Sequence, residues 1–210
     1  MDYYAVMPGK NVIKHYDVDA YYHVYNRGVN KRVIFKDDQD YAVFMGLLKR
    51  YLGRKIEIDS SKREYPNYSE NLDLVAFCLM PNHFHLLLHQ HEDIKSMEAF
   101  MRSLATSYTR YFNTKYKRVG HLFQGVYKAS RITSDPYLLH ISRYIHMNPK
   151  DYKNWPYSSW PYFTKGWMAD WVKQHKIFEL FEGGNYEQFV DDYKQTKEEI
   201  ELLKAELADR

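Results

Sequence analysis

Leu79-Met80-Pro81-Asn82-His83-Phe84-His85-Leu86-Leu87-Leu88 is the stretch of sequence from which the fold can be inferred. Met80-Pro81-Asn82 has the composition of a turn, and it lies between two apolar runs, residues 72–79 and residues 83–90. Two such runs joined by a short turn predict an antiparallel β-hairpin. Alternate side chains of a strand share a face, so we expect Phe84, Leu86 and Leu88 to face the core.

The opposite face of the second strand carries histidines. His83, His85 and His89 lie on it together with Leu87. An imidazole is mostly neutral at neutral pH and can then bind a metal. His83 and His85, side by side at the start of the strand, can therefore chelate one divalent ion. The pair is also compatible with two polar residues on a half-exposed strand, and a complete metal site needs a third ligand from elsewhere.

Further elements flank the hairpin in a regular order. We expect a strand at residues 21–26, a helix capped at Asp37 or Asp38 that runs to Gly53, and a helix from Asp93 or Ser96. A β-like pattern follows at residues 120–132, and a helix from residue 134 or 135 should end near Pro149. This order predicts an α+β domain with a ferredoxin-like antiparallel sheet and helices on one face.

The domain organisation follows from a change in composition late in the chain. We assign residues 1–162 to the α+β domain and residues 163–210 to a C-terminal, mostly helical extension, with one or two amphipathic helices in residues 186–210. The single cysteine, Cys78, cannot form a disulfide within the chain, and no secretory signal is visible, so we expect a cytoplasmic protein. No apolar run approaches the roughly 18 residues that a membrane span needs.

The distribution of charge is more informative than the net charge of +3. Residues 99–134 contain seven basic residues and no acidic one, with tyrosines and phenylalanines between them, whereas residues 182–210 contain nine acidic residues and four basic ones. Basic side chains hold phosphates and aromatic rings stack on bases, so this stretch indicates a nucleic-acid partner. The alternatives are a solvated helix face for the charges and core positions for most of the rings.

Tyr144 and Asn148 are four residues apart on the last predicted helix and so share a face. The Asn148 carbonyl oxygen is a candidate third metal ligand, which would hold the Tyr144 hydroxyl close to the ion. A metal that neutralises the charge of a phosphate makes the phosphate a target for a weak nucleophile such as tyrosine. The other interpretations are that Tyr144 belongs to the core and that Asn148 ends the helix before Pro149.

Several motifs in a fixed order resemble one known family. They are Tyr22-His23-Val24-Tyr25-Asn26-Arg27-Gly28, the hairpin stretch quoted above, Gly120-His121-Leu122-Phe123-Gln124-Gly125 with Tyr127-Lys128-Ala129, Tyr144-Ile145-His146-Met147-Asn148-Pro149, and Trp155-Pro156-Tyr157-Ser158-Ser159. In this order and spacing the chain resembles the HUH single-tyrosine transposases over roughly residues 18–162. It is most similar to the transposase-like proteins associated with repetitive extragenic palindromes in bacteria.

The resemblance implies a nuclease that recognises single-stranded or hairpin DNA with Mg²⁺ or Mn²⁺ as cofactor. It implies that His83 and His85 bind the metal, that Asn148 is the third ligand and that Tyr144 is the nucleophile, which forms a 5′-phosphotyrosine. A nucleoid-associated location follows from the DNA partner. A swapped homodimer and a monomer are both found among such proteins. We expect the DNA contacts to come from Arg27, Arg102, Arg110, Lys117, Arg118, Lys128 and Arg131.

Two other functions are compatible with the motifs. One is a catalytically idle protein that binds chromosomal palindromes, which would share every motif with the nuclease. The other is a metal hydrolase of small substrates built on His83 and His85 alone. The basic and aromatic stretch disfavours the hydrolase, because a small substrate does not require it.

Overall fold

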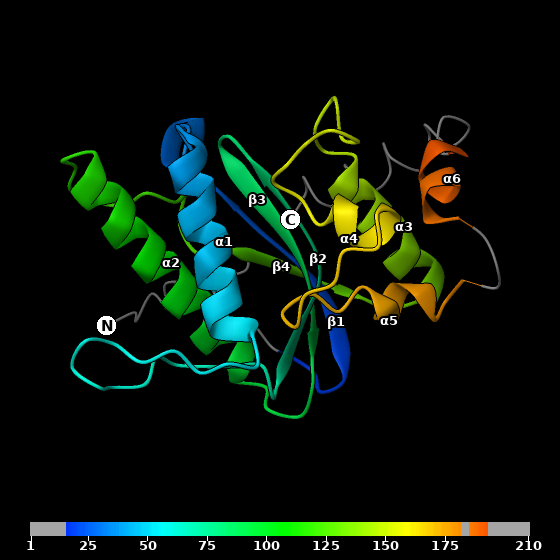
Figure 1. Ribbon diagram of the computed structural model, residues 1–210, viewed down its shortest axis with the longest axis horizontal. Coiled ribbons are helices and arrows are strands. Elements are labelled where there is room, and N and C mark those ends of the chain that lie inside the picture. Colours follow the sequence, from blue (N-terminus) through cyan, green and yellow to red (C-terminus); the bar gives the residue numbers. More distant parts are fainter. Residues whose placement is uncertain (1–15, 182–184, 193–210) are drawn as a thin grey trace, which may run out of the picture.

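The computed structural model describes residues 16–181 and 185–192 of the chain. At its centre lies a four-stranded antiparallel sheet with the order β2-β3-β1-β4 (Figure 1). Its strands are β1 (Ala20–Arg27), β2 (Leu72–Met80), β3 (His83–Gln90) and β4 (Lys128–Ile132). Helix α1 (Asp38–Leu52) connects β1 to β2, and helix α2 (Ser96–Lys115) connects β3 to β4. This is the ferredoxin-like arrangement, so the predicted fold class is confirmed.

The predicted hairpin is formed by β2 and β3. Met80 pairs with His83 and Leu79 with Phe84, so only Pro81 and Asn82 remain in the turn. The Pro81 carbonyl accepts the backbone N–H groups of residues 34 and 35, which lie in the segment between β1 and α1. The turn before β3 is therefore held against this segment.

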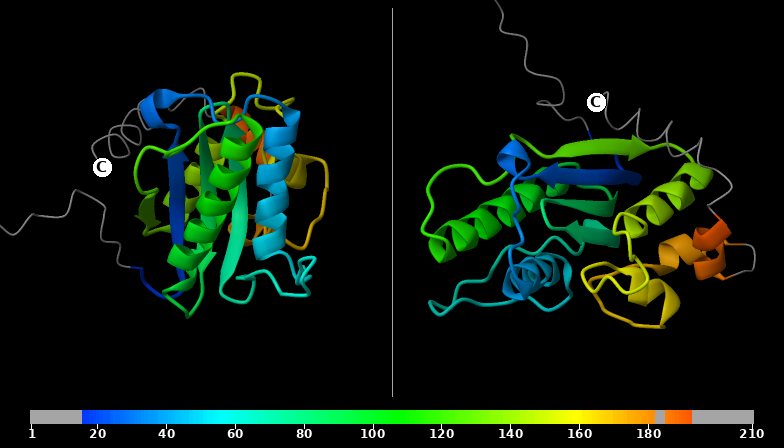
Figure 2. Two further views of the ribbon diagram at one scale, coloured as in Figure 1. Left: turned by 90° about the vertical axis from the view of Figure 1, so that its left-hand side faces the viewer. Right: turned by 90° about the horizontal axis from the view of Figure 1, so that it is seen from above.

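One face of the sheet is covered by α1 and α2, as Figure 2 shows. The alternate residues Phe84, Leu86 and Leu88 are buried there, as predicted from the period of the strand. Each large apolar side chain buried in this way stabilises the fold by about 1.5–3 kcal/mol. The two helices are also tied by charge, because Lys115 contacts Asp37 at 2.6 Å and the buried Asp40 at 2.8 Å. Asp37 caps α1 through the backbone N–H of Asp40, as expected.

The other face of the sheet is covered as well. Helix α3 (Asp135–His146) packs on β2 and β3, and α4 (Trp160–Thr164), α5 (His175–Phe178) and α6 (Tyr186–Asp191) follow on the same side (Figure 1). The expectation of helices on one face thus holds only for α1 and α2. The second face needs its own cover because it carries Val75, Ala76, Cys78 and Leu87, all fully buried.

Strand β4 is shorter than the β-like pattern of residues 120–132 predicts. Only residues 128–132 form a strand, and residues 119–127 form a loop in which Gly120 and Gly125 have positive φ angles of 87° and 67°. This loop is anchored to the end of β1 by a bridge between Gly28 and Phe123 and by the Gln124 N–H bond to the Arg27 carbonyl. The loop therefore passes the C-terminal end of β1 on its way from α2 to β4.

The described part of the C-terminal segment packs into the hydrophobic core between α3 and the sheet. Ile177, Tyr186 and Val190 are buried against α3 and Trp160. One or two amphipathic helices were predicted for residues 186–210. Helix α6 lies in this range, and residues 193–210 lie outside the described residues. Within the described part of the chain, every helix is too short or too polar to cross a membrane.

Candidate active site

The predicted metal ligands lie together at the end of the sheet where β1 ends and β3 begins. His83 and His85 share a face of β3, with ring centroids 5.0 Å apart. Asn148 follows α3, which packs over this face, and its side-chain oxygen lies 3.4 Å from Nε2 of His83. The fold thus brings two residues of a strand and one residue from beyond a distant helix to the same point.

His83 is oriented by its neighbour in the turn. Its Nδ1–H donates to the Asn82 side-chain oxygen at 2.7 Å, and the Asn82 amide nitrogen in turn donates to the Lys31 carbonyl at 3.3 Å. With the proton on Nδ1, the lone pair of Nε2 points toward Asn148. An outer hydrogen bond of this kind fixes the tautomer that a metal ligand requires.

His85 is oriented by a second histidine, on β1. Nδ1 of His85 lies 2.8 Å from Nε2 of His23. Nε2 of His85 is buried and has no hydrogen-bond partner among the described residues. If Nδ1 of His85 donates to His23, its Nε2 carries a free lone pair directed into the site.

Burial keeps these imidazoles neutral. It lowers the pKa of His83, and it lowers the pKa of His85 well below its usual value, with further lowering from the neighbouring His23 and His83. Burial also lowers the pKa of His23 to about 3. Neutral imidazoles are the form that binds metal, so the site requires no deprotonation at neutral pH.

Tyr144 lies beside the histidine pair. Its ring meets the rings of His85 and His23 edge to face, with centroids 5.5 Å and 5.9 Å away. Burial raises the pKa of the Tyr144 hydroxyl, and the contact with Asn148 offsets part of this rise. The hydroxyl is therefore protonated at neutral pH, and it needs an activating group before it can act as a nucleophile.

The donor set fits a divalent cation. The Asn148 amide nitrogen donates to the Tyr144 carbonyl at 3.0 Å, which directs its side-chain oxygen toward the histidines. That oxygen and Nε2 of His83 are then two acceptors that face each other at 3.4 Å, because the His83 proton is on Nδ1. Two imidazole nitrogens and one amide oxygen suit Mn²⁺ and, with added water ligands, Mg²⁺.

The predicted DNA-contacting residues do not form one cluster. Arg27 pairs in the sheet with His83 and bonds Gln124 at 2.6 Å, and Lys128 lies 5.8 Å from the Tyr25 ring, so both are beside the site. Arg131 points to the α2 face of β4 and pairs with Asp17 at 3.1 Å. The remaining four, Arg102, Arg110, Lys117 and Arg118, lie on α2 and in the segment after it.

A groove of about 750 Å³ separates α2 from the loop of residues 119–127. Arg110, Thr106 and His121 line it together with the exposed Val126. Arg102 is exposed at a neighbouring cavity and pairs with Glu98, whereas Arg118 bonds Asn113. Most rings of this stretch belong to the core, since Tyr108, Phe112, Phe123 and Tyr127 are buried.

Two residues that support the site were not predicted from the sequence. His23 stands in the first quoted motif, and its pairing beside β3 could have been inferred from the strand order. Asn82 was treated only as a turn residue. The signal for both was their place next to His83 and His85, either in the chain or across the sheet.

Comparison with known proteins defines the class of this chain. A family model described as "Transposase IS200 like" matches residues 18–148, which is more than half of the chain. The chain belongs to the IS200-like transposase family, and the resemblance to single-tyrosine transposases is confirmed at this level. It is thus a transposase-type protein whose partner is DNA. Comparison with curated proteins gives no match.

One solved structure supports the fold. The structure of a REP-associated tyrosine transposase bound to a REP hairpin matches with a TM-score of 0.54 and 15% identity, covering 78% of this chain and 92% of the other. At this identity the likeness supports the fold alone. A proposed transposase from Deinococcus radiodurans matches with a TM-score of 0.38 and 20% identity over 63% of this chain and 92% of the other.

Proposed function

We propose that this protein is a metal-dependent endonuclease and strand transferase that cuts single-stranded or hairpin DNA through a covalent bond to Tyr144. The observation that supports the proposal most is the meeting of Tyr144 with His83, His85 and Asn148. These residues come from a strand, a helix and the segment after it. Family membership supplies the chemical class.

The reaction follows from the groups present. The Tyr144 oxygen attacks a phosphodiester, the bond from phosphorus to the 3′ oxygen breaks, and the leaving oxygen takes up the proton that the tyrosine loses. The products are a 5′-phosphotyrosine and a free 3′-OH, and the reverse attack by a 3′-OH rejoins DNA without ATP. A divalent ion held by His83, His85 and Asn148 supplies Lewis-acid neutralisation of the phosphate charge.

The DNA path is proposed from the position of the loop of residues 119–127. Arg27 and Lys128 hold phosphates beside Tyr144, and the loop carries the strand from there to the groove lined by Arg110. Arg102, Lys117 and Arg118 extend the positive charge along α2. Arg131, already paired with Asp17, contributes least. This arrangement favours a single strand or hairpin end that bends around the sheet edge.

We propose that Tyr144 serves the metal site of its own chain, because α3 packs on the same sheet that carries the histidines. A monomer is then sufficient for cleavage. We also propose that residues 1–162 carry the nuclease and that the described part of the segment from residue 163 covers the back of α3. Since DNA is the partner, the protein acts in the bacterial cytoplasm at the nucleoid.

The idle DNA-binding protein is the second candidate, since it would have the same motifs. The two differ in one assay, in which labelled hairpin and single-stranded oligonucleotides are incubated with Mn²⁺. We expect nicking that EDTA abolishes and that Tyr144→Phe lacks while it still binds the DNA. Binding without nicking under any divalent ion would contradict the proposal and favour the idle protein. Nicking that survives EDTA would exclude the metal role.

A further inference from the structure

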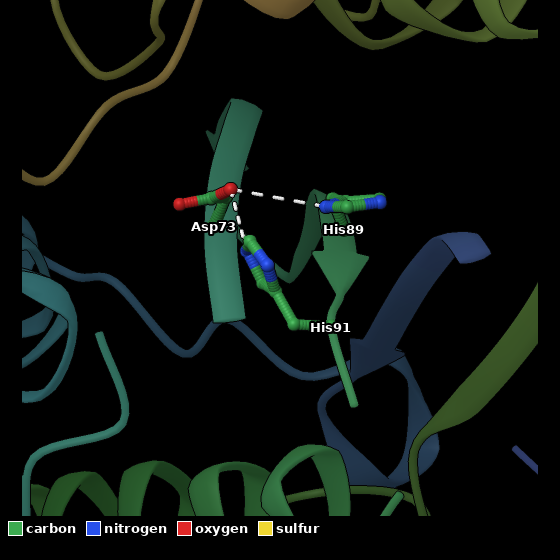
Figure 3. A group of neighbouring side chains, drawn as sticks. All are labelled: Asp73, His89 and His91. Carbon is green, nitrogen blue, oxygen red and sulfur yellow. Dashed lines mark hydrogen bonds and ion pairs between the residues drawn. The ribbon is translucent and has the colours of Figure 1, made fainter. Parts of the chain in front are cut away.

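A second group of metal-binding side chains lies at the far end of β3. It consists of Asp73 at the start of β2, His89 near the end of β3 and His91 just beyond it (Figure 3). One ligand atom from each lies within 4.8 Å of the others. His89 is six residues from His83 along the strand, or roughly 20 Å at the rise of a β-strand, so the group is separate from the nuclease site.

The two ring nitrogens of His89 differ in their hydrogen bonding. Its Nε2 lies 2.8 Å from a carboxylate oxygen of Asp19. Its Nδ1 is buried, has no hydrogen-bond partner among the described residues, and lies 3.8 Å from the Asp73 carboxylate. The His89 side chain as a whole is only 6% exposed.

In the tautomer with its proton on Nε2, His89 donates to the Asp19 carboxylate. The lone pair of Nδ1 then faces the Asp73 carboxylate, so two electron-rich atoms confront each other without a proton between them. A cation placed at this point would bind both. Many metalloproteins contain a histidine that binds the metal through one nitrogen and donates from the other nitrogen to a carboxylate. The carboxylate fixes the tautomer of the histidine.

The two remaining groups are suited to bind the same cation. His91 Nε2 lies 2.8 Å from the same Asp73 oxygen that faces His89. A cation bound between the two histidines is therefore within reach of the Asp73 carboxylate as well.

The backbone holds these side chains in place. Asp73 and His89 are direct partners in the β2–β3 pairing. The His91 N–H donates to the Asn71 carbonyl at 2.9 Å, and the His91 carbonyl accepts the Asp19 N–H at 3.1 Å. Ligands on paired strands keep their geometry without an ion, which lowers the cost of ordering them when one binds.

Lys176 is the competing cation in the protein alone. Its Nζ lies 3.3 Å from the Asp73 oxygen, and its side chain is 18% exposed. This is the same Asp73 oxygen that faces the two histidines, so Lys176 competes with a bound cation for it. Replacement of Lys176 should accordingly strengthen metal binding.

We propose that Asp73, His89 and His91 form a second metal site that takes a Zn²⁺-type transition ion, with Asp19 as the outer partner of His89. Two imidazoles and one carboxylate with a water molecule complete the tetrahedral set that Zn²⁺ prefers. The site joins β2 to the segment after β3 and serves stability, and it does not depend on the proposed nuclease function.

The test uses the full chain carrying His83→Ala and His85→Ala, which removes the first site. Zn²⁺ is titrated by equilibrium dialysis, and Co²⁺ is used as a spectroscopic probe of tetrahedral geometry. We expect one Zn²⁺ per chain and visible Co²⁺ absorption. Adding His91→Ala should weaken binding by at least about 100-fold, and Asp19→Asn by about 10–100-fold, as for outer partners. Lys176→Met should tighten binding, and the exposed His121→Ala should leave it unchanged.

Wild-type protein provides the second measurement, should the double variant fold poorly. Its Zn²⁺ stoichiometry should exceed that of His91→Ala by one per chain. Equal stoichiometry, or binding that His91→Ala leaves intact, would overturn the proposal and leave the three side chains as a hydrogen-bonded network. Nicking is measured on the same samples, so a failure of this site is distinguishable from a failure of the nuclease assignment.

Discussion

Nε2 of His23 lies 2.8 Å from Nδ1 of His85, and both rings are buried. The contact joins β1 to β3 beneath the proposed nuclease site, with the rings stacked at a centroid distance of 5.0 Å. If His23 accepts the Nδ1 proton, the unpartnered Nε2 of His85 is left to bind a metal. His23 is thus a positioning residue that acts through His85.

Loss of this contact should weaken metal binding more than it weakens the fold. We expect His23→Ala to lower the Mn²⁺ affinity by about 10–100-fold, because an outer partner orients the ligand. His23→Gln, whose side-chain oxygen can accept the same proton, should recover part of the affinity. Titration of Mn²⁺ followed by electron paramagnetic resonance measures both. Equal affinity in wild type and His23→Ala would show that His85 needs no support.

The position of Tyr144 against the histidines of its own chain predicts cleavage in cis. Tyr144→Phe and the double variant His83→Ala/His85→Ala should each be inactive. A mixture of the two should remain inactive, because no tyrosine can reach the intact metal site of another chain. Nicking of labelled oligonucleotides measures this. Activity restored by mixing would contradict the prediction and indicate a swapped dimer.

Arg110 should contribute to DNA affinity without selecting a sequence. Arg110→Ala should weaken binding of single strands, and the slope of log affinity against log salt should fall by about 0.7, the value for one phosphate contact on single-stranded DNA. Fluorescence anisotropy at several salt concentrations measures the slope. Lys49→Ala, an exposed change on α1, is the matched control. An equal salt dependence of DNA affinity in wild type, Arg110→Ala and Lys49→Ala would show that Arg110 makes no phosphate contact.

Acid should destabilise the protein through its buried histidines. His146 is fully buried between the hydroxyls of Tyr186 and Ser159, and burial lowers its pKa to about 3. The unfolded chain takes up a proton below a pH of about 6.5 while the folded chain stays neutral. Stability is therefore complete above pH 6.5 and falls as the pH is lowered toward 3.

The contribution of His146 can be isolated from the slope of unfolding free energy against pH. Each such histidine costs about 1.4 kcal/mol of unfolding free energy per pH unit in this window. His146→Gln should reduce the slope by this amount, whatever its effect on overall stability, and the exposed His121→Gln should not. Urea unfolding between pH 6.5 and 4.5 measures the slope. A slope unchanged by His146→Gln would mean that the buried ring is protonated in the folded state.

The order of elements could be predicted because periodicity and turn residues are local. The Pro81-Asn82 turn and the alternation around Phe84 predicted the hairpin and its core face correctly. The cover on the other face could not be predicted, since Leu87 looks isolated among histidines in the sequence. Its apolar neighbours Val75 and Ala76 come from the other strand and meet it only in the folded sheet.

The proposed nuclease site was predictable only in part. His83 and His85 are adjacent on one strand, and the spacing of Tyr144 and Asn148 reflects one helical turn, so each pair is visible in the sequence. That the pairs meet depends on packing of α3 against β3. The second cluster was missed because Asp73 and His89 are brought together by strand register, which can be inferred only after the hairpin is assigned.

The most direct test of the central claim is the identification of the residue that becomes attached to DNA. An oligonucleotide is cleaved with Mn²⁺, the covalent product is digested with protease and nuclease, and the modified peptide is sequenced by mass spectrometry. We predict a nucleotide linked through its 5′ phosphate to Tyr144, and no adduct from Tyr144→Phe. An adduct on another tyrosine, or one that persists in Tyr144→Phe, would contradict the assignment of Tyr144 as the nucleophile.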